Sequence, residues 1–164
     1  MEEGKLRKKD IKIVIAAHKP YRMPEDTMYV PLHVGAEGKK NPDGTPLDLG
    51  YQRDNEGDNI SAKNPYYCEL TGIYYAWKNI PAEYLGLVHY RRYFKGKNKS
   101  KDPFACIVTE PEMEKIFETH RIVVPKKRKY YIETLYSHYA HTHYAEHLDC
   151  VREIIGEQCP DYLN

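Results

Sequence analysis

The sequence predicts an α/β fold with a mostly parallel central sheet and flanking helices. Two short runs, Ile11–Ala17 and Tyr84–His89, are apolar at nearly every position, as strands covered on both faces are. A helical pattern over residues 65–79 separates them, which gives the β–α–β order typical of a parallel sheet. With 164 residues the chain can bury a core. We expect residues 1–10 to be a disordered N-terminal segment and residues 11–164 to form a single domain.

The first third of the chain predicts two strands and a long polar segment. The strand over residues 11–17 must end before Pro20, which cannot continue a ladder. Residues 28–36 predict a second strand, and Pro31 within it favours an edge position or a bulge. Residues 37–58 are rich in Gly, Asn, Asp and Pro and predict a long loop, a type that often carries function.

The most clearly marked element is the helix over residues 65–79. Asn64 is a typical N-cap, Pro65 suits the first helical position, and Pro81 bars continuation. The following strand, residues 84–89, is apolar on both faces and is expected to be central in the sheet. Apolar residues at helical spacing predict the buried face of the helix, namely Leu70, Ile73, Tyr74 and Trp77.

Three further elements are predicted in the second half of the chain. Thr109 and Glu112 form a capping box that starts a helix. Residues 121–125 predict a short strand because they are rich in β-branched side chains. Residues 132–156 are helical in composition, with a break near His143.

Composition excludes several classes of protein. A net charge of +1 is far from the strongly basic balance of proteins that bind nucleic acid through its phosphates. No apolar run approaches the roughly 20 residues of a membrane span, and the N-terminus lacks the apolar segment of a signal peptide. We expect a cytoplasmic protein with at most peripheral association with the inner face of the membrane. The cysteines lack zinc-ribbon spacing and do not suggest a disulfide framework: Cys68, Cys106, Cys150 and Cys159.

A cationic cluster follows the strand over residues 84–89. Arg91 and Arg92 carry planar forks of donors that match a diphosphate or a carboxylate, and a structural salt-bridge cluster is the equally weighted alternative. In an extended chain their side chains would point in opposite directions, so both serve one ligand only if the chain turns after Tyr90. Glu69, on the preceding helix, is a candidate partner for either arginine.

A polar turn over residues 57–64 leads into the predicted helix. Free N–H groups at a helix N-terminus bind anions, although capping by Asn64 alone explains the same residues. Asp58 could accept sugar hydroxyls, ligate a metal or shape an Asx turn.

Other motifs are absent or weak. The chain contains no GxGxxG, P-loop or GxSxG motif, and no Asp-x-Asp at the end of an apolar strand. Four histidines lack the HExxH pattern, so an exposed helix is favoured over a zinc site: His138, His141, His143 and His147.

Several segments together carry a family resemblance that covers nearly the whole chain from residue 11. They are His18–Lys19, Asp58–Ser61, Asn64, Tyr67–Thr71, Trp77–Asn79, Gly86–Phe94, Val124–Pro125 and the region of Tyr139 and His143. This combination resembles a bacterial family, the glycosyltransferase-type domain of unknown function (DUF4422) of capsular and exopolysaccharide biosynthesis proteins.

The resemblance implies a GT-A-like (Rossmann-like) nucleotide-diphospho-sugar transferase fold. It implies an enzyme of the hexosyltransferase type that moves a sugar from a nucleotide-sugar, a UDP-linked donor, to a surface glycan or lipid-linked glycan. Members of the family run on past this chain, so we expect truncation at the C-terminus, which would remove acceptor-side residues and full activity. The alternatives are a non-catalytic domain that binds sugar nucleotides or glycan, and a scaffold of a polysaccharide-assembly complex.

The resemblance also implies a site. Cations at the end of the strand over residues 84–89 would replace the usual metal and steady the leaving diphosphate, so no cofactor is expected; a divalent ion, manganese or magnesium, is the alternative. The catalytic candidates are Asp58, Glu69 and His89, and no metal ligand is assigned. The expected substrate-binding residues are His18, Lys19, Tyr21, Asp58, Asn59, Ser61, Asn64, His89, Tyr90, Arg91 and Arg92.

Overall fold

The computed structural model describes residues 8–163, which fall into two compact units divided between Val123 and Val124. Most of the N-terminal segment that the sequence predicts to be disordered lies outside the described residues. That residues 11–164 form one domain stays a prediction.

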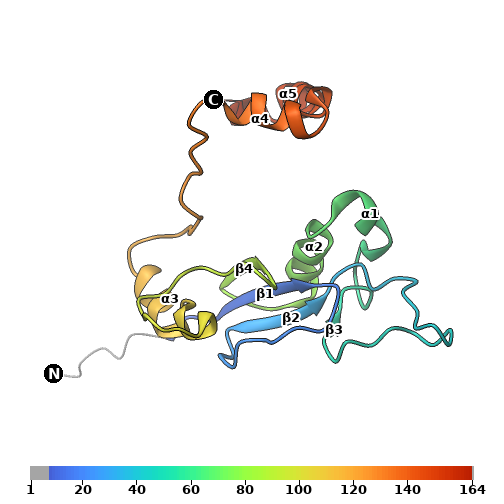
Figure 1. Cartoon of the computed structure of the whole chain (residues 1–164), viewed down its shortest axis with the longest axis vertical. Helices are drawn as coiled ribbons and strands as arrows, with labels where there is room; N and C mark the ends of the chain where they lie inside the picture. The colour runs from blue at the N-terminus through green and yellow to red at the C-terminus, as the bar shows by residue number, and fades with distance from the viewer. Residues whose placement is uncertain (1–7, 164) are drawn as a thin grey trace. The chain divides into compact units, whose positions relative to one another are not determined.

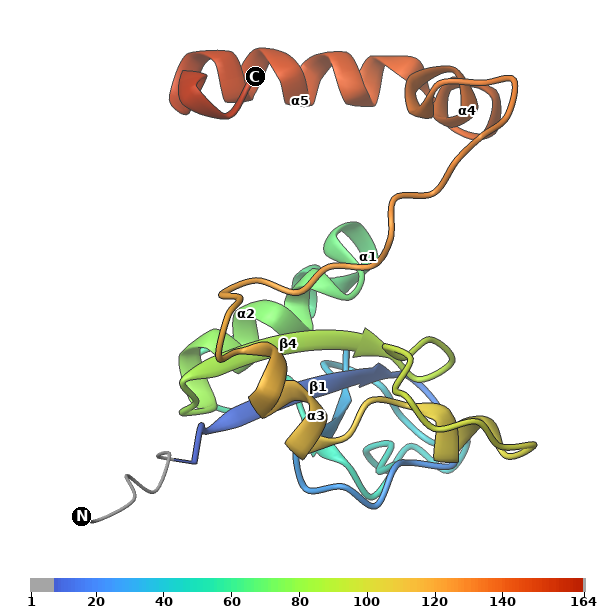
Figure 2. The same cartoon turned by 90° about the vertical axis from the view of Figure 1, so that its left-hand side faces the viewer.

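The first unit is built on a four-stranded parallel sheet, as the sequence predicts. Its strands are β1 (Ile11–Ala17), β2 (Tyr29–His33), β3 (Gln52–Arg53) and β4 (Tyr84–His89), in the order β3-β2-β1-β4. Figures 1 and 2 show β1 beside β4, with both arrows pointing the same way. Two expectations are corrected: β4 lies at an edge of the described sheet, and β3 interrupts the predicted loop over residues 37–58.

Pro31 does not place β2 at an edge, because β2 lies between β1 and β3. The Val34 N–H donates to β1, and in a parallel ladder alternate residues face the same neighbour, so the Pro31 nitrogen faces the β3 side. The short β3 pairs only with Leu32 and His33. The missing N–H of Pro31 therefore costs no hydrogen bond of the ladder.

Side chains from the two faces of the sheet enter two separate cores. Alternate residues of β1, including Ile13 and Ile15, pack with Val88 and with Met113 of α3 (Glu110–Ile116). The intervening residues pack with Tyr75 and Ala76 of α2 (Leu70–Asn79). Because both faces are covered, the nearly continuous apolar run of β1 is explained.

The predicted helix over residues 65–79 is two helices. α1 (Asn64–Tyr67) ends at Cys68, whose φ of 48° and ψ of −130° break the helix, and α2 begins at Leu70. Asn64 is the first helical residue and not the N-cap, which is Lys63. The Asn64 side chain instead donates to the carbonyl of Cys68 and so closes the break.

The buried face of α2 also differs from the prediction. Leu70 and Trp77, expected in the core, are 57% and 65% exposed. Thr71, Gly72, Tyr75 and Ala76 are buried in their place. The reason is close approach of helix and sheet, since a Cβ on Gly72 would lie 2.8 Å from Val34 Cγ1.

The remaining elements follow the sequence in part. The capping box of Thr109 and Glu112 at the start of α3 is confirmed. The predicted strand over residues 121–125 is wrong: this segment pairs with no strand of the described sheet, and Val123 packs against the β1 core instead.

In the second unit, α4 (Leu135–Thr142) and α5 (Ala145–Gln158) are separated at His143, which confirms the predicted break. The Tyr136 hydroxyl lies 3.1 Å and 3.0 Å from the two carboxylate oxygens of Asp149 and ties the two helices together. Among the described residues, no helix has both the length and the apolar character needed to cross a membrane.

Candidate functional site

The carboxyl ends of β1 and β4 meet at Tyr90, the residue that directly follows β4. Its side chain is 1% exposed, and its ring is the centre of an aromatic cluster. The ring centroids of His18, Tyr21 and His89 lie 5.3, 5.1 and 4.3 Å from that of Tyr90. Carboxyl ends of neighbouring parallel strands are where open α/β sheets bind ligands. The structure therefore brings these four sequence-predicted site residues together.

Two cations lie over the same ring. Lys19 Nζ is 5.7 Å and Arg91 Cζ 5.1 Å from the Tyr90 centroid, within the range of a cation–π interaction. The buried aromatic ring thus positions positive charge from the loops after β1 and β4.

The chain turns directly after Tyr90, which is the condition for Arg91 and Arg92 to act together. The Arg92 N–H donates to the carbonyl of His89 at 2.8 Å, closing a tight turn. Both arginines then line one open depression of about 400 Å³ together with Glu69 and His89. The geometry therefore allows both guanidinium groups to contact one ligand.

Glu69 faces His89 and not an arginine. Its Oε1 atom lies 3.8 Å from His89 Nε2, and within residues 8–163 it makes no ion pair with Arg91 or Arg92. The hypothesis of a Glu69–arginine pair is therefore wrong. Glu69 is the N-cap of α2, so the start of this helix supplies a carboxylate to the lining of this depression.

Burial and charge set the protonation of His89. Burial lowers the pKa of its imidazole, Glu69 opposes this shift, and the positive charges of Arg91 and Arg92 add to it. A lowered pKa favours the neutral imidazole near pH 7, which can accept a proton.

His33, at the carboxyl end of β2, was not identified from the sequence. It is 1% exposed, and its Nδ1 atom has no hydrogen-bond partner among the described residues. Burial lowers the pKa of this imidazole, Asp54 opposes the shift, and the charges of Arg53 and Lys39 add to it. In the sequence, nothing distinguishes His33 from any other residue of a predicted strand. Only the pairing of β2 with β1 shows that it lies at the same edge of the sheet as His18.

Asp58 lies at the other end of α2. Its carboxylate accepts a hydrogen bond from the Tyr74 hydroxyl at 3.1 Å and lies 4.0 Å from Lys78 Nζ, and the side chain of Asn79 bonds its backbone. Ten residues of α2 span about 15 Å, so the structure does not bring Asp58 to the Glu69 end of the helix.

The other residues predicted in the polar turn are engaged in internal hydrogen bonds. Asn59 accepts from the Ser61 N–H and donates to the carbonyl of Gly57, which forms an Asx turn. The Ser61 hydroxyl donates to Asp54 and accepts from the Glu37 N–H. Like Asn64 at the helix break, Asn59 and Ser61 shape the loop, and their predicted contact with a substrate stays a prediction.

Asp54 is the most deeply buried carboxylate of the first unit's polar loops, with no exposed surface. It accepts hydrogen bonds from the N–H groups of Gly35 and Ala36 and from the hydroxyls of Ser61 and Thr71. One carboxylate therefore joins the loop after β2, the polar turn and α2. In the sequence it is one aspartate among many in a polar segment, and no spacing singles it out.

The donor set at the end of β4 does not suit the divalent ion that this fold often holds. Within residues 8–163 no group of three or more His, Cys, Asp or Glu side chains is arranged to hold a metal. Glu69 already faces His89, and two guanidinium groups line the same depression.

The fold is similar to part of a solved glycosyltransferase. The chain superimposes on the apo structure of the bifunctional glycosyltransferase WbbM with a TM-score of 0.74 and 28% sequence identity. The match covers 93% of this chain and 30% of the WbbM chain, so it concerns one part of that protein. These features define a glycosyltransferase-like α/β domain.

The particular family is shown by the sequence itself. Residues 12–164 match the family described as "Domain of unknown function (DUF4422)", and the chain belongs to that family. This confirms the resemblance noted from the sequence motifs. A comparison with curated proteins finds no match.

Proposed function

We propose that this protein is a glycosyltransferase domain that transfers a hexose from a UDP-linked donor to a surface glycan. The observation that carries the proposal is the convergence of His18, Lys19, His89 and Arg91 on the buried ring of Tyr90. The similarity to WbbM supports the reaction class. The donor, the glycan and a role in capsule or exopolysaccharide synthesis are part of the proposal.

In this proposal the diphosphate of the donor lies in the depression lined by Arg91 and Arg92. A guanidinium group presents paired donors to phosphate oxygens and keeps its charge at every physiological pH. When the bond between the sugar and the diphosphate breaks, negative charge develops on the leaving phosphate. Fixed cations at that position stabilise the transition state more than the bound substrate.

His89 is the best-placed proton acceptor in the same depression. Its lowered pKa keeps the imidazole available as a base, and Glu69 stabilises the imidazolium that forms when it takes a proton from the acceptor hydroxyl. Glu69 acts here as a positioning residue. Of the three catalytic candidates, Asp58 is the weakest, because it lies at the far end of α2 from this depression.

The reaction is tested with purified protein, a panel of UDP-hexoses, and release of UDP as the readout. Arg91→Ala should lower kcat/KM by about a hundredfold or more, in line with loss of one group that stabilises developing charge. Arg121→Ala is the matched control, since Arg121 is also exposed and lies outside the depression. Binding of UDP-hexoses without any release of UDP would favour a non-catalytic binding domain and contradict the proposal.

A further inference from the structure

Three neighbouring depressions of the first unit share lining residues. Arg91 lines both the depression at the end of β4 and a smaller aromatic pocket of about 140 Å³. Phe104 and Ile107 line that aromatic pocket and also a third pocket of about 320 Å³. The shared residues place the three depressions in a row, and together they are called the groove.

The aromatic pocket forms the middle of this groove. Tyr21, Tyr90 and Tyr93 supply its walls, with Phe104 at the boundary to the third pocket. Aromatic side chains offer flat apolar faces with few rotatable bonds, so they bind ring-shaped ligands at low entropic cost. The middle of the groove is therefore suited to a ring-shaped ligand.

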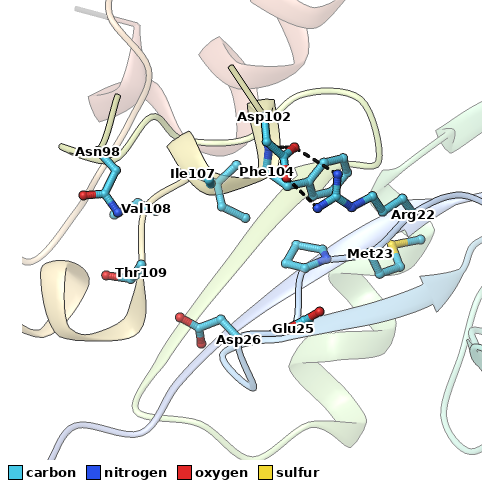
Figure 3. A pocket seen from close by; sticks show the side chains of 12 residues that line it. Arg22, Met23, Glu25, Asp26, Asn98, Asp102, Phe104, Ile107, Val108 and Thr109 are labelled. Atoms are coloured by element: carbon cyan, nitrogen blue, oxygen red, sulfur yellow. Dashed lines mark hydrogen bonds and ion pairs between the residues drawn. The ribbon is translucent and has the colours of Figure 1, made fainter. Parts of the chain in front are cut away.

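The third pocket, shown in Figure 3, is bounded by the loop after β1 and the loop that follows β4. Arg22 joins the two loops: its Nη1 and Nη2 atoms donate to the two carboxylate oxygens of Asp102 at 2.9 and 2.7 Å, and its guanidinium lies 4.5 Å from the Phe104 centroid. This bidentate pair holds the wall of the pocket in a fixed position.

Polar groups that lack a protein partner line the same pocket. The side chains of Glu25 and Asn98 make no hydrogen bond to other described residues, and both are exposed. A carboxylate accepts, and an amide both accepts and donates, which matches the hydroxyl groups of a sugar. With Asp26 and Asp102 also in the lining, the acidic groups outnumber the single arginine.

The lining of the groove changes along its length. Two arginines line the depression at the end of β4, which suits a diphosphate, whereas carboxylates and an amide are prominent in the lining of the third pocket. An oligosaccharide fits this lining, because sugar rings stack on aromatic faces and hydroxyls pair with carboxylates and amides.

We propose that the groove from Arg91 through Phe104 to Asn98 binds the acceptor glycan, with its reacting end at the β4 depression and its following sugar residues in the aromatic and acidic pockets. This inference rests on the proposed function for the identity of its ligand. It assigns the acceptor subsites to the loop over residues 98–109, which neither the sequence motifs nor the diphosphate site includes.

The test measures binding of oligosaccharides from bacterial capsules and exopolysaccharides, as short and long fragments of each, first on a glycan array and then by titration calorimetry. Asn98→Ala should weaken binding of the long fragments about tenfold, the equivalent of one lost hydrogen bond to the ligand, and leave binding of UDP unchanged. Phe104→Ala should weaken them at least as much. Lys101→Ala, an exposed change on the same loop outside the pocket lining, is the control.

Three outcomes overturn the inference: no oligosaccharide binds, the Asn98 variant binds long fragments as tightly as wild type, or a basic peptide binds the groove in place of glycan. Asn98→Ala keeps the test decisive even if Phe104→Ala disturbs folding, because the Asn98 side chain is exposed and makes no hydrogen bond to another described residue. If wild type binds glycan but does not bind UDP, the proposed transferase function is refuted, and the assignment of the groove to glycan still holds.

Discussion

Glu69 Oε1 lies 3.8 Å from His89 Nε2, so the start of α2 and the end of β4 are electrostatically coupled across the proposed diphosphate site. The carboxylate favours the protonated imidazole and opposes the burial that lowers the His89 pKa. Glu69→Gln should therefore lower the His89 pKa further. Titration of the histidine ring signals by NMR measures this shift. Glu118→Gln, at an exposed position on another element, should leave the His89 signal unchanged, and an unchanged or raised pKa in Glu69→Gln would contradict the coupling.

His33 should make the free energy of unfolding depend on pH. Its folded-state pKa is lowered by burial, so below the ordinary imidazole pKa the unfolded chain binds more protons than the native protein. The free energy of unfolding should therefore fall as pH is lowered from about 7.5 to about 5.5. Urea unfolding of His33→Gln should show a flatter dependence over this window. His120→Gln, at an exposed histidine, should keep the wild-type slope; equal slopes for all three proteins would refute the assignment.

Asp54 is predicted to be the largest single polar contribution to the stability of the first unit. Asp54→Ala leaves two buried N–H groups and the Ser61 hydroxyl without their acceptor, while the Thr71 hydroxyl keeps the Cys68 carbonyl, and should cost about 3 kcal/mol or more. Ser61→Ala removes only one of these donors and should cost about 1 kcal/mol. Chemical denaturation of both variants measures the difference. Equal losses of stability in the two variants would contradict the larger contribution assigned to Asp54.

Replacing Cys68 with glycine should stabilise the protein. Its φ of 48° with ψ of −130° is strained for a residue with a Cβ, and Gly adopts it freely. Cys68→Gly should raise the free energy of unfolding by about 1 kcal/mol, because the relieved strain exceeds the added entropy of the unfolded chain. Cys150→Gly, inside α5, should lower it by a similar amount. A loss of stability in Cys68→Gly would mean that the thiol side chain, and not the backbone, matters there.

Local patterns predicted the elements whose signals are local. The apolar run of β1, the capping box of Thr109 and Glu112 and the break at His143 each depend on neighbouring residues, and all three are confirmed. The buried face of α2 was mispredicted because large aromatic residues outweighed Gly72 and Ala76 in the pattern. Only the distance between helix and sheet, visible as the close approach of Gly72 to Val34, decides that small residues face inward.

The sequence predicted the part of the candidate site that lies at the strand ends. His18, Lys19, Tyr21, His89, Tyr90, Arg91 and Arg92 follow strand ends, and a parallel sheet gathers strand ends at one edge. The placement of Asp58, His33 and Asp54 depends on contacts between segments far apart in the chain. No periodicity encodes these contacts, so the sequence could not separate loop-shaping side chains from those at the cationic edge.

The most direct test of the central claim is titration calorimetry of UDP binding in the presence of EDTA. Wild type should bind UDP without metal, and Arg91→Ala should weaken binding about tenfold or more through loss of a charged hydrogen-bonding group. Arg121→Ala should bind as wild type does. Absence of binding until manganese is restored, or equal affinity of Arg91→Ala and wild type, would contradict a diphosphate site formed by the cations after β4.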